Sequence, residues 1–123
     1  MSRSIPVALL MRPDSGYYRG VLRGIKAYAD QIQSWVFGMA ALTSDLPMML
    51  QTWRPAGVLA FIYANEAPES LTTLGIPVVS FANIDQSLSL PMVGVDDVAV
   101  GQMAAEHLLE RGFRHFAFAG CPS

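Results

Sequence analysis

Short apolar runs recur along the chain, and between them apolar residues return at helical spacing. The runs lack the polar alternation of a strand with one wet face, so they predict strands that are covered on both faces. Predicted strands occupy residues 5–11, 35–41, 57–62, 75–81 (a turn and then a strand), 93–95 and 113–120, and predicted helices occupy residues 17–33, 46–53, 68–74 and 97–111. This alternation predicts one α/β domain, a doubly wound parallel sheet with helices on both faces and right-handed crossovers.

The helix predicted over residues 97–111 has two distinct sides. Its polar side carries Gln102, Glu106 and Glu110, and its apolar side carries Val100, Gly101, Ala104, Ala105 and Leu108. An apolar stripe at this spacing is typical of a helix that covers a core. Gly112 suits the left-handed position after the helix, so residues 113–120 are expected to re-enter the sheet as a buried strand.

Two glycines interrupt the helix predicted over residues 17–33. Gly20 and Gly24 lie four residues apart, which lowers helix propensity but leaves a shallow groove on one side. We expect a strand or a partner helix to approach the backbone there.

Composition and charge narrow the class of protein. Of the 123 residues, 52% are hydrophobic and the mean hydropathy is +0.34, yet no apolar run approaches the ~18 residues that cross a bilayer. The single cysteine, Cys121, and the poor match of the N-terminus to a signal peptide favour a soluble cytoplasmic protein without membrane contact. A net charge of -2 lacks the basic footprint of a DNA-binding surface, and the high apolar content suggests a covering domain or subunit.

The motifs of common catalytic and cofactor sites are missing. No Gly-rich phosphate-binding motif follows a strand, and the strand ends lack the acidic cluster, Asp and Lys of a phosphoacceptor receiver domain. His107, His115 and Cys121 do not have metal-ligand spacing, and Ser80 lies outside any nucleophile motif. We expect no cofactor, no metal and no enzymatic activity.

Polar groups do gather, beside aromatic residues, where the predicted strands end. Ligands of open α/β sheets bind outside the carboxyl ends of strands, and carboxylates, amides and rings together can hold a hydroxyl-rich ligand. The candidate ligand-binding residues are Arg12, Asp14, Tyr17, Tyr63, Asn65, Asn83, Asp96 and Asp97. For each one the alternative is an exposed loop residue or a helix cap, and Asp97 is well placed to be the N-cap of the following helix.

The last third of the chain carries a family resemblance. Residues 95–97, the segment Glu106-His107-Leu108-Leu109 and residues 112–120 resemble a LacI/GalR-type effector-binding domain, which has the type I periplasmic-binding-protein fold. The family pattern is V-D-N, a helix ending H-L-L, and then G-H-R-R-I-A-F-I-G. This chain departs from it at Asp97, where Asn is usual, and at Phe113, where His is usual.

The start of the chain suggests a branch. Residues 16–29, Trp35 and residues 57–60 resemble the xylose-operon-regulator branch of the AraC family, in which the sensor precedes a pair of helix-turn-helix motifs. The first predicted strand begins almost at Met1, which agrees with that order. The resemblance implies that the chain crosses to a second lobe after residues 115–120. Residues 1–123 would then be one truncated N-terminal lobe, without the second lobe and the DNA-binding domain.

The resemblance also implies a function. It predicts the effector-sensing part of a transcription regulator that responds to a monosaccharide such as a pentose, forms a homodimer and contacts DNA only through a domain outside this chain. The alternatives are a stand-alone sugar-binding protein of transport type, which needs an export signal, and a fragment of an α/β enzyme. We further expect self-association through helix faces that include Tyr18, Leu22 or Met103.

Overall fold

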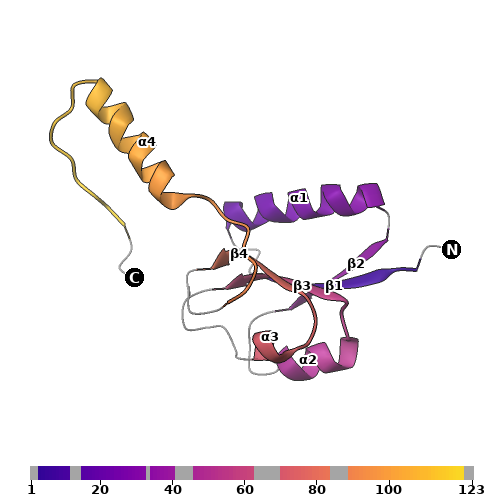
Figure 1. Cartoon of the computed structure of the whole chain (residues 1–123). Helices are drawn as coiled ribbons and strands as arrows, with labels where there is room; N and C mark the ends of the chain where they lie inside the picture. The colour runs from indigo at the N-terminus through magenta and orange to yellow at the C-terminus, as the bar shows by residue number, and fades with distance from the viewer. Residues whose placement is uncertain are drawn as a thin grey trace.

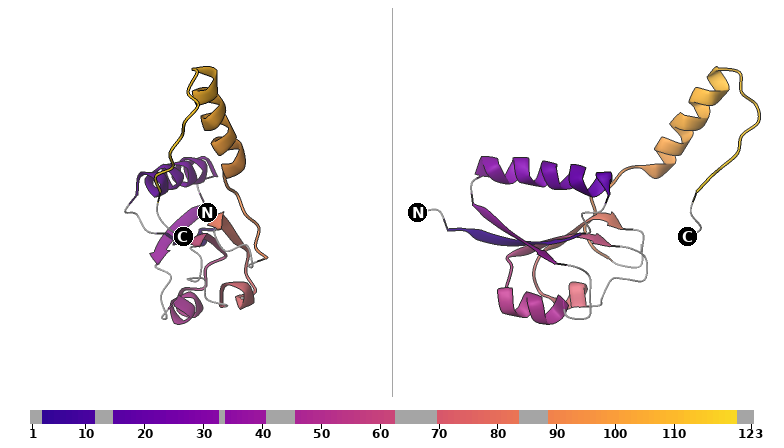
Figure 2. Two further views of the ribbon diagram at one scale, coloured as in Figure 1. Left: turned by 90° about the vertical axis from the view of Figure 1, so that its left-hand side faces the viewer. Right: turned by 180° about the vertical axis from the view of Figure 1, so that it is seen from behind.

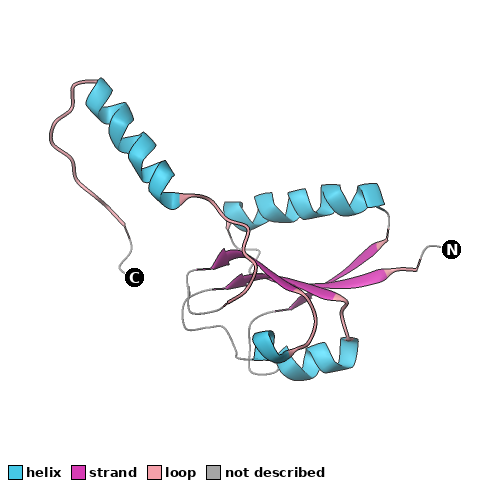
Figure 3. Cartoon of the chain, viewed as in Figure 1, coloured by secondary structure: helices cyan, strands magenta, loops and turns pink. Residues whose placement is uncertain are grey.

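Strands and helices alternate along the chain as predicted (Figures 1 and 3). The computed structural model describes residues 3–11, 15–32, 34–40, 46–62, 70–83 and 89–120. Its elements are β1 (Ile5–Leu10), α1 (Gly16–Ile32), β2 (Trp35–Ala40), α2 (Leu46–Trp53), β3 (Gly57–Ile62), α3 (Ser70–Thr73), β4 (Val78–Asn83) and α4 (Asp97–Glu110). Among them, α2 and β3 begin and end at the predicted residues.

The strands form one parallel sheet in the order β2-β1-β3-β4. β1 pairs with β2 along Ile5–Leu10 and with β3 from Val7 to Leu10. Helix α1 covers one face of the sheet, whereas α2 and α3 cover the other (Figure 2). The predicted doubly wound α/β sheet is therefore confirmed.

Each face of the sheet has its own apolar cluster. Leu9, Met11, Tyr18 and Phe81 are buried on the side of α1. The cluster on the side of α2 and α3 consists of Ala8, Leu10, Leu46, Leu50, Val58, Ala60, Ile62, Leu71 and Val78. Since successive residues of a strand point to opposite faces, the unbroken apolar run of β1 fills both clusters.

The outer edge of β4 is partly occupied by the chain that follows it. The backbone N–H of Ser80 donates to the carbonyl of Pro91 at 2.9 Å, and the N–H of Val93 donates to the carbonyl of Ser80 at 2.8 Å. This isolated parallel bridge is at Met92, and the strand predicted over residues 93–95 does not form. The Ser80 side chain is fully buried, and its hydroxyl has no hydrogen-bond partner within the described residues.

The predicted burial of the last helix and strand is wrong. No residue of α4 is buried, and residues 113–120 are extended and exposed and belong to no strand. Phe118 is 93% exposed, and Val100, from the apolar side of α4, is 52% exposed. After the bridge at Met92 the chain leaves the sheet, and α4 carries residues 113–120 away from it (Figure 1).

The expected close approach at Gly20 and Gly24 is likewise absent among the described residues. A Cβ built on either glycine meets no atom within 4 Å outside its own stretch of helix, whereas Gly75 has a positive φ of 67°. The two kinds of glycine therefore respond differently to substitution.

Gly24→Ala is expected to raise the free energy of unfolding by about 0.5–1 kcal/mol, because alanine has the higher helix propensity and enters open space. Gly75→Ala is the matched control and is expected to lower that free energy by about 1–2 kcal/mol, because a Cβ strains the left-handed backbone. Urea unfolding followed by circular dichroism measures both. A loss of stability in Gly24→Ala would show that its open face is covered.

Candidate functional site

Tyr17 lies at the carboxyl edge of the sheet, where α1 begins. The side-chain oxygen of Ser15 accepts a hydrogen bond from the N–H of Tyr18 at 3.3 Å, and its carbonyl accepts one from the N–H of Arg19 at 3.2 Å. These bonds satisfy backbone donors that a helix start leaves free. The helix is thereby fixed directly after β1, and Tyr17 in its first turn reaches the ends of the neighbouring strands.

The Tyr17 hydroxyl ties the start of α1 to the end of β4. It donates a hydrogen bond to the carbonyl of Phe81 at 3.0 Å, across 64 residues of sequence. The Tyr17 ring lies edge-on to those of Tyr18 and Phe61, with centroid distances of 5.8 and 6.2 Å. Rings in such arrangements attract one another beyond their burial alone, so the position of Tyr17 is held by both its ring and its hydroxyl.

Phe61 and Phe81 complete an aromatic cluster that the sequence analysis missed. The ring of Phe61 lies 4.5 Å from that of Tyr18 and 5.8 Å from that of Phe81, measured between centroids. Tyr17 is 47% exposed, whereas Phe81 is buried. The available signal was an aromatic residue close to the carboxyl end of each of two predicted strands. The cluster therefore presents one half-exposed ring, Tyr17, on a packed aromatic base.

Asp96 caps α4, and Asp97 lies in its first turn. The Oδ1 of Asp96 accepts a hydrogen bond from the N–H of Ala99 at 3.0 Å, which makes Asp96 the N-cap in place of the predicted Asp97. Both residues are exposed, and a carboxylate in the first turn interacts favourably with the helix dipole. Residues 89–96, which lead into α4, pass the N-terminal end of α1 (Figures 1 and 2). The acidic pair therefore lies beyond the same edge of the sheet that Tyr17 occupies.

The other candidates are only partly placed. Asn83 is the last residue of β4 and is paired with Ile62 at the end of β3. Arg12, Asp14, Tyr63 and Asn65 lie outside the described residues. The structure thus places Tyr17, Asp96, Asp97 and the backbone of Asn83.

Among the described residues, no three His, Cys, Asp or Glu side chains converge in a way that could hold a metal ion. None of the helices there combines the length and the apolar character that a membrane-spanning segment requires.

Known proteins resemble this chain in sequence and in fold. The HTH-type transcriptional regulator GntR of Pseudomonas aeruginosa PAO1 is 35% identical over 78 residues, which cover 62% of this chain and 23% of that protein. A crystal structure of a PurR family transcriptional regulator from Vibrio parahaemolyticus RIMD 2210633 matches with a TM-score of 0.64 and 21% identity, over 89% of this chain and 43% of that one. No protein-family model matches.

These similarities support the coarser part of the predicted resemblance. The chain shares its α/β fold with the PurR family regulator, and 78 of its residues align with a part of the GntR regulator. It spans less than half the length of either relative. These partial matches therefore do not show what the full-length protein binds.

Tyr17→Phe is expected to lower the free energy of unfolding by about 0.5–1.5 kcal/mol, because the carbonyl of Phe81 loses its donor. Tyr28→Phe, at an exposed ring near the other end of α1, is the matched control and should change it by less than about 0.5 kcal/mol. Urea unfolding measures both. Equal effects would mean that the Tyr17 bond contributes nothing.

Asp96→Ala is expected to destabilise α4 by about 1 kcal/mol, and Asp97→Ala by less, because only Asp96 caps the helix. Since no residue of α4 is buried, the change should appear as lost helical NMR shifts in residues 97–110, with the unfolding midpoint of the sheet unchanged. If Asp97→Ala were the more damaging variant, the assigned cap would be wrong.

Proposed function

We propose that this chain is part of an effector-sensing domain of a transcription regulator, and that it binds a small hydroxyl-rich ligand at the carboxyl edge of its sheet. The observation that carries the proposal is the course of the chain after β4. Residues 89–96 pass the carboxyl edge of the sheet beside the start of α1. The chain then continues into α4 and residues 113–120, whose apolar side chains are exposed (Figure 1). Exposed apolar surface of this kind typically marks a contact with another domain or subunit.

A part of the domain outside this chain is needed to cover α4 and residues 113–120. An isolated helix of 14 residues is marginal in water, and α4 has no buried residue to stabilise it. Val98 and Met103 on α4 are 73% and 69% exposed, and Phe118 beyond it is 93% exposed. In this proposal, residues 1–123 belong to the first of two lobes, and the crossing to the second lobe is expected after residues 115–120, as the sequence resemblance implies.

The proposed ligand site lies between the lobes, at the first lobe's carboxyl edge. The half-exposed Tyr17 ring offers a flat surface for the apolar face of a sugar ring, and the carboxylates of Asp96 and Asp97 at the start of α4 can accept hydrogen bonds from hydroxyls. Arg12, Asp14, Tyr63, Asn65 and the side chain of Asn83 remain predicted contacts from loops that follow the same strands. This donor and acceptor set favours a neutral monosaccharide, and its role is binding rather than catalysis.

The regulator would act as a homodimer in the cytoplasm, with DNA contacted by a domain outside this chain. A ligand bound between two lobes can shift a regulator only if it has different affinities for the open and closed states. The AraC-type, xylose-responsive arrangement rests on the sequence resemblance of residues 16–29, and neither relative is named for that family. Reading the gene on both sides of residues 1–123 distinguishes that arrangement from a LacI-like one.

A thermal-shift screen of monosaccharides, pentoses included, against the whole gene product tests the ligand class. At least one sugar is expected to raise the melting temperature, because a ligand that binds only the native state stabilises it. Tyr17→Ala is expected to lower the affinity for that sugar by about tenfold. Tyr28→Ala, at an exposed ring, is expected to leave the affinity unchanged. A screen without any stabilising sugar would reject this ligand class, and a gene without a second α/β lobe or a DNA-binding domain would reject the regulator.

A further inference from the structure

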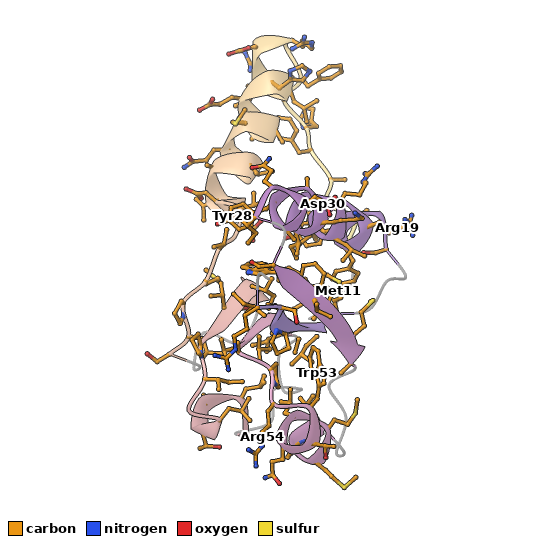
Figure 4. All side chains as sticks on the ribbon, turned by 90° about the vertical axis from the view of Figure 1, so that its right-hand side faces the viewer. Met11, Arg19, Tyr28, Asp30, Trp53 and Arg54 are labelled. Carbon is orange, nitrogen blue, oxygen red and sulfur yellow. The ribbon has the colours of Figure 1, made fainter. Side chains whose placement is uncertain are left out.

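α4 and residues 113–120, which we call the arm, stand apart from the sheet. No residue of α4 is buried, and residues 113–120 are all exposed. In Figure 4 the side chains of α4 extend outward around the helix, whereas the Trp53 ring on α2 lies directly over Gly38 of β2. A helix of this length gains most of its stability from packing, so the arm requires a docking surface.

The arm and the strand before it expose enough apolar surface for a stable interface. Large apolar side chains that are at least 40% exposed recur from residue 92 to residue 118. They are Met92, Val93, Val95, Val98, Val100, Met103, Leu108, Leu109, Phe113, Phe116 and Phe118. Together they expose on the order of 1,000 Å², whereas a stable interface takes about 800 Å² from each partner.

Residues 91–93 form an open strand edge on their outer side. The carbonyl of Pro91 and the N–H of Val93 both bond to Ser80 of β4. Neighbouring residues of an extended strand direct their peptide groups to opposite sides, so the N–H and the carbonyl of Met92 face away from β4. Within the described residues the sheet ends at β4 and this bridge. One further strand can therefore pair with residues 91–93.

An apolar hollow of about 310 Å³ lies beside the same edge. It is lined by residues of α3, of β4 and of the segment 89–91, among them Leu71, Val78 and Leu90. Leu71 and Val78 belong to the apolar cluster on the side of α2 and α3, which places the hollow on that face of the sheet. The hollow is thus a site for an apolar helix face beside α3.

The hand of parallel connections relates the edge to the hollow. The connection from β3 through α3 to β4 moves outward across the sheet. A further right-handed connection in the same direction places its helix on the same face as α3. A strand added beyond residues 91–93, with a helix before it, therefore has that helix over the hollow. The arm has this order, since α4 precedes residues 113–120.

We propose that two copies of residues 1–123 exchange arms, so that each arm docks on the β4 side of the other copy. Residues 113–120 pair with the outer side of residues 91–93, and the apolar side of α4 covers the hollow beside α3. The arm runs away from its own sheet (Figure 1), which places it within reach of a second copy. Since donor and acceptor surfaces lie on the same chain, two copies satisfy one another about a two-fold axis.

The exchange goes beyond the proposed function. For residues 1–123 by themselves, the second copy supplies the cover that the proposed function assigns to a part of the domain outside this chain. The exchange does not involve the ligand edge at Tyr17, so the two proposals are tested by different measurements.

Charge and chain course agree with the exchange. No charged residue lines the hollow, and residues 89–95 carry no charge. Glu106 and Glu110 lie on the polar side of α4, opposite to the side that docks, so they stay in solvent. Only residues 93–96 separate the bridge at Met92 from α4, and short connections of this kind favour exchange between copies.

The arm also revises the predicted helix faces. Met103 is 69% exposed and belongs to the arm. Tyr18 is only 4% exposed and is part of the core, so it is not available to a partner. Leu22 on α1 packs against the same core cluster and lies outside this surface.

Sedimentation of the chain and of matched variants tests the exchange. The chain is expected to form a dimer, and Phe118→Lys to raise its dissociation constant by about tenfold or more, because the docked strand then carries a charge at an apolar surface. Phe118 is 93% exposed, so the variant is expected to fold. Met48→Lys, at a 66% exposed position on α2, is the control and should leave the constant unchanged. A chain that ends at Arg111 should be monomeric.

A longer connection distinguishes exchange from simple contact between arms. Insertion of about six Gly and Ser residues after Gly94 lets the arm fold back on its own copy, so the dimer is expected to convert to a monomer. In the unmodified chain, amides of residues 113–120 are expected to become more protected from hydrogen exchange as the concentration rises.

Three results would overturn the exchange: a monomeric wild type, an unaffected dimer in Phe118→Lys, or a dimer that the insertion leaves unchanged. A dimer lost in Val36→Lys but kept in Phe118→Lys would also overturn it and would place the contact at β2. Sugar-dependent melting is measured on the whole gene product, so a monomeric chain would reject the exchange and leave the ligand proposal intact.

Discussion

The parallel pairing of β1 with both β2 and β3 is the constraint on which the rest of the structure depends. It places β1 inside the sheet, with Leu9 buried on the side of α1 and Leu10 on the side of α2 and α3. A parallel connection requires a crossover, and the order β2-β1-β3-β4 sends the first crossover to one face and the next two to the other. The carboxyl ends of β1, β3 and β4 consequently lie along one edge of the sheet.

At that edge, local and long-range hydrogen bonds together hold the first turn of α1. Ser15 fixes the start of α1, and Tyr17 in the first turn reaches the carbonyl of Phe81. The aromatic base beneath Tyr17 is continuous with the buried cluster that holds α1 on the sheet. A half-exposed ring on a packed base has a fixed orientation, which would lower the entropy lost on binding of the proposed ligand.

After this edge the chain continues into α4, which has no buried residue. α4 is capped by Asp96 and ended by Gly112 in a left-handed conformation, so its ends are specified locally. Its apolar side chains have no core to enter within the described residues. The lateral edge at β2 lies on the other side of the sheet from β4.

The sequence by itself determined the order and the approximate extent of the elements from β1 to α4, because apolar periodicity, turn residues and caps act over a few neighbouring positions. It also placed Tyr17 among the ligand-binding candidates, since a residue just after a strand of such a sheet lies at its carboxyl edge. The choice of Asp96 over Asp97 as the cap is also local, because Asp96 bonds to Ala99 only three residues away. Only the tertiary structure decided that Tyr17 bonds to Phe81 and that residues 113–120 stay outside the sheet. Those two outcomes depend on contacts between residues far apart in sequence, which an apolar pattern does not specify.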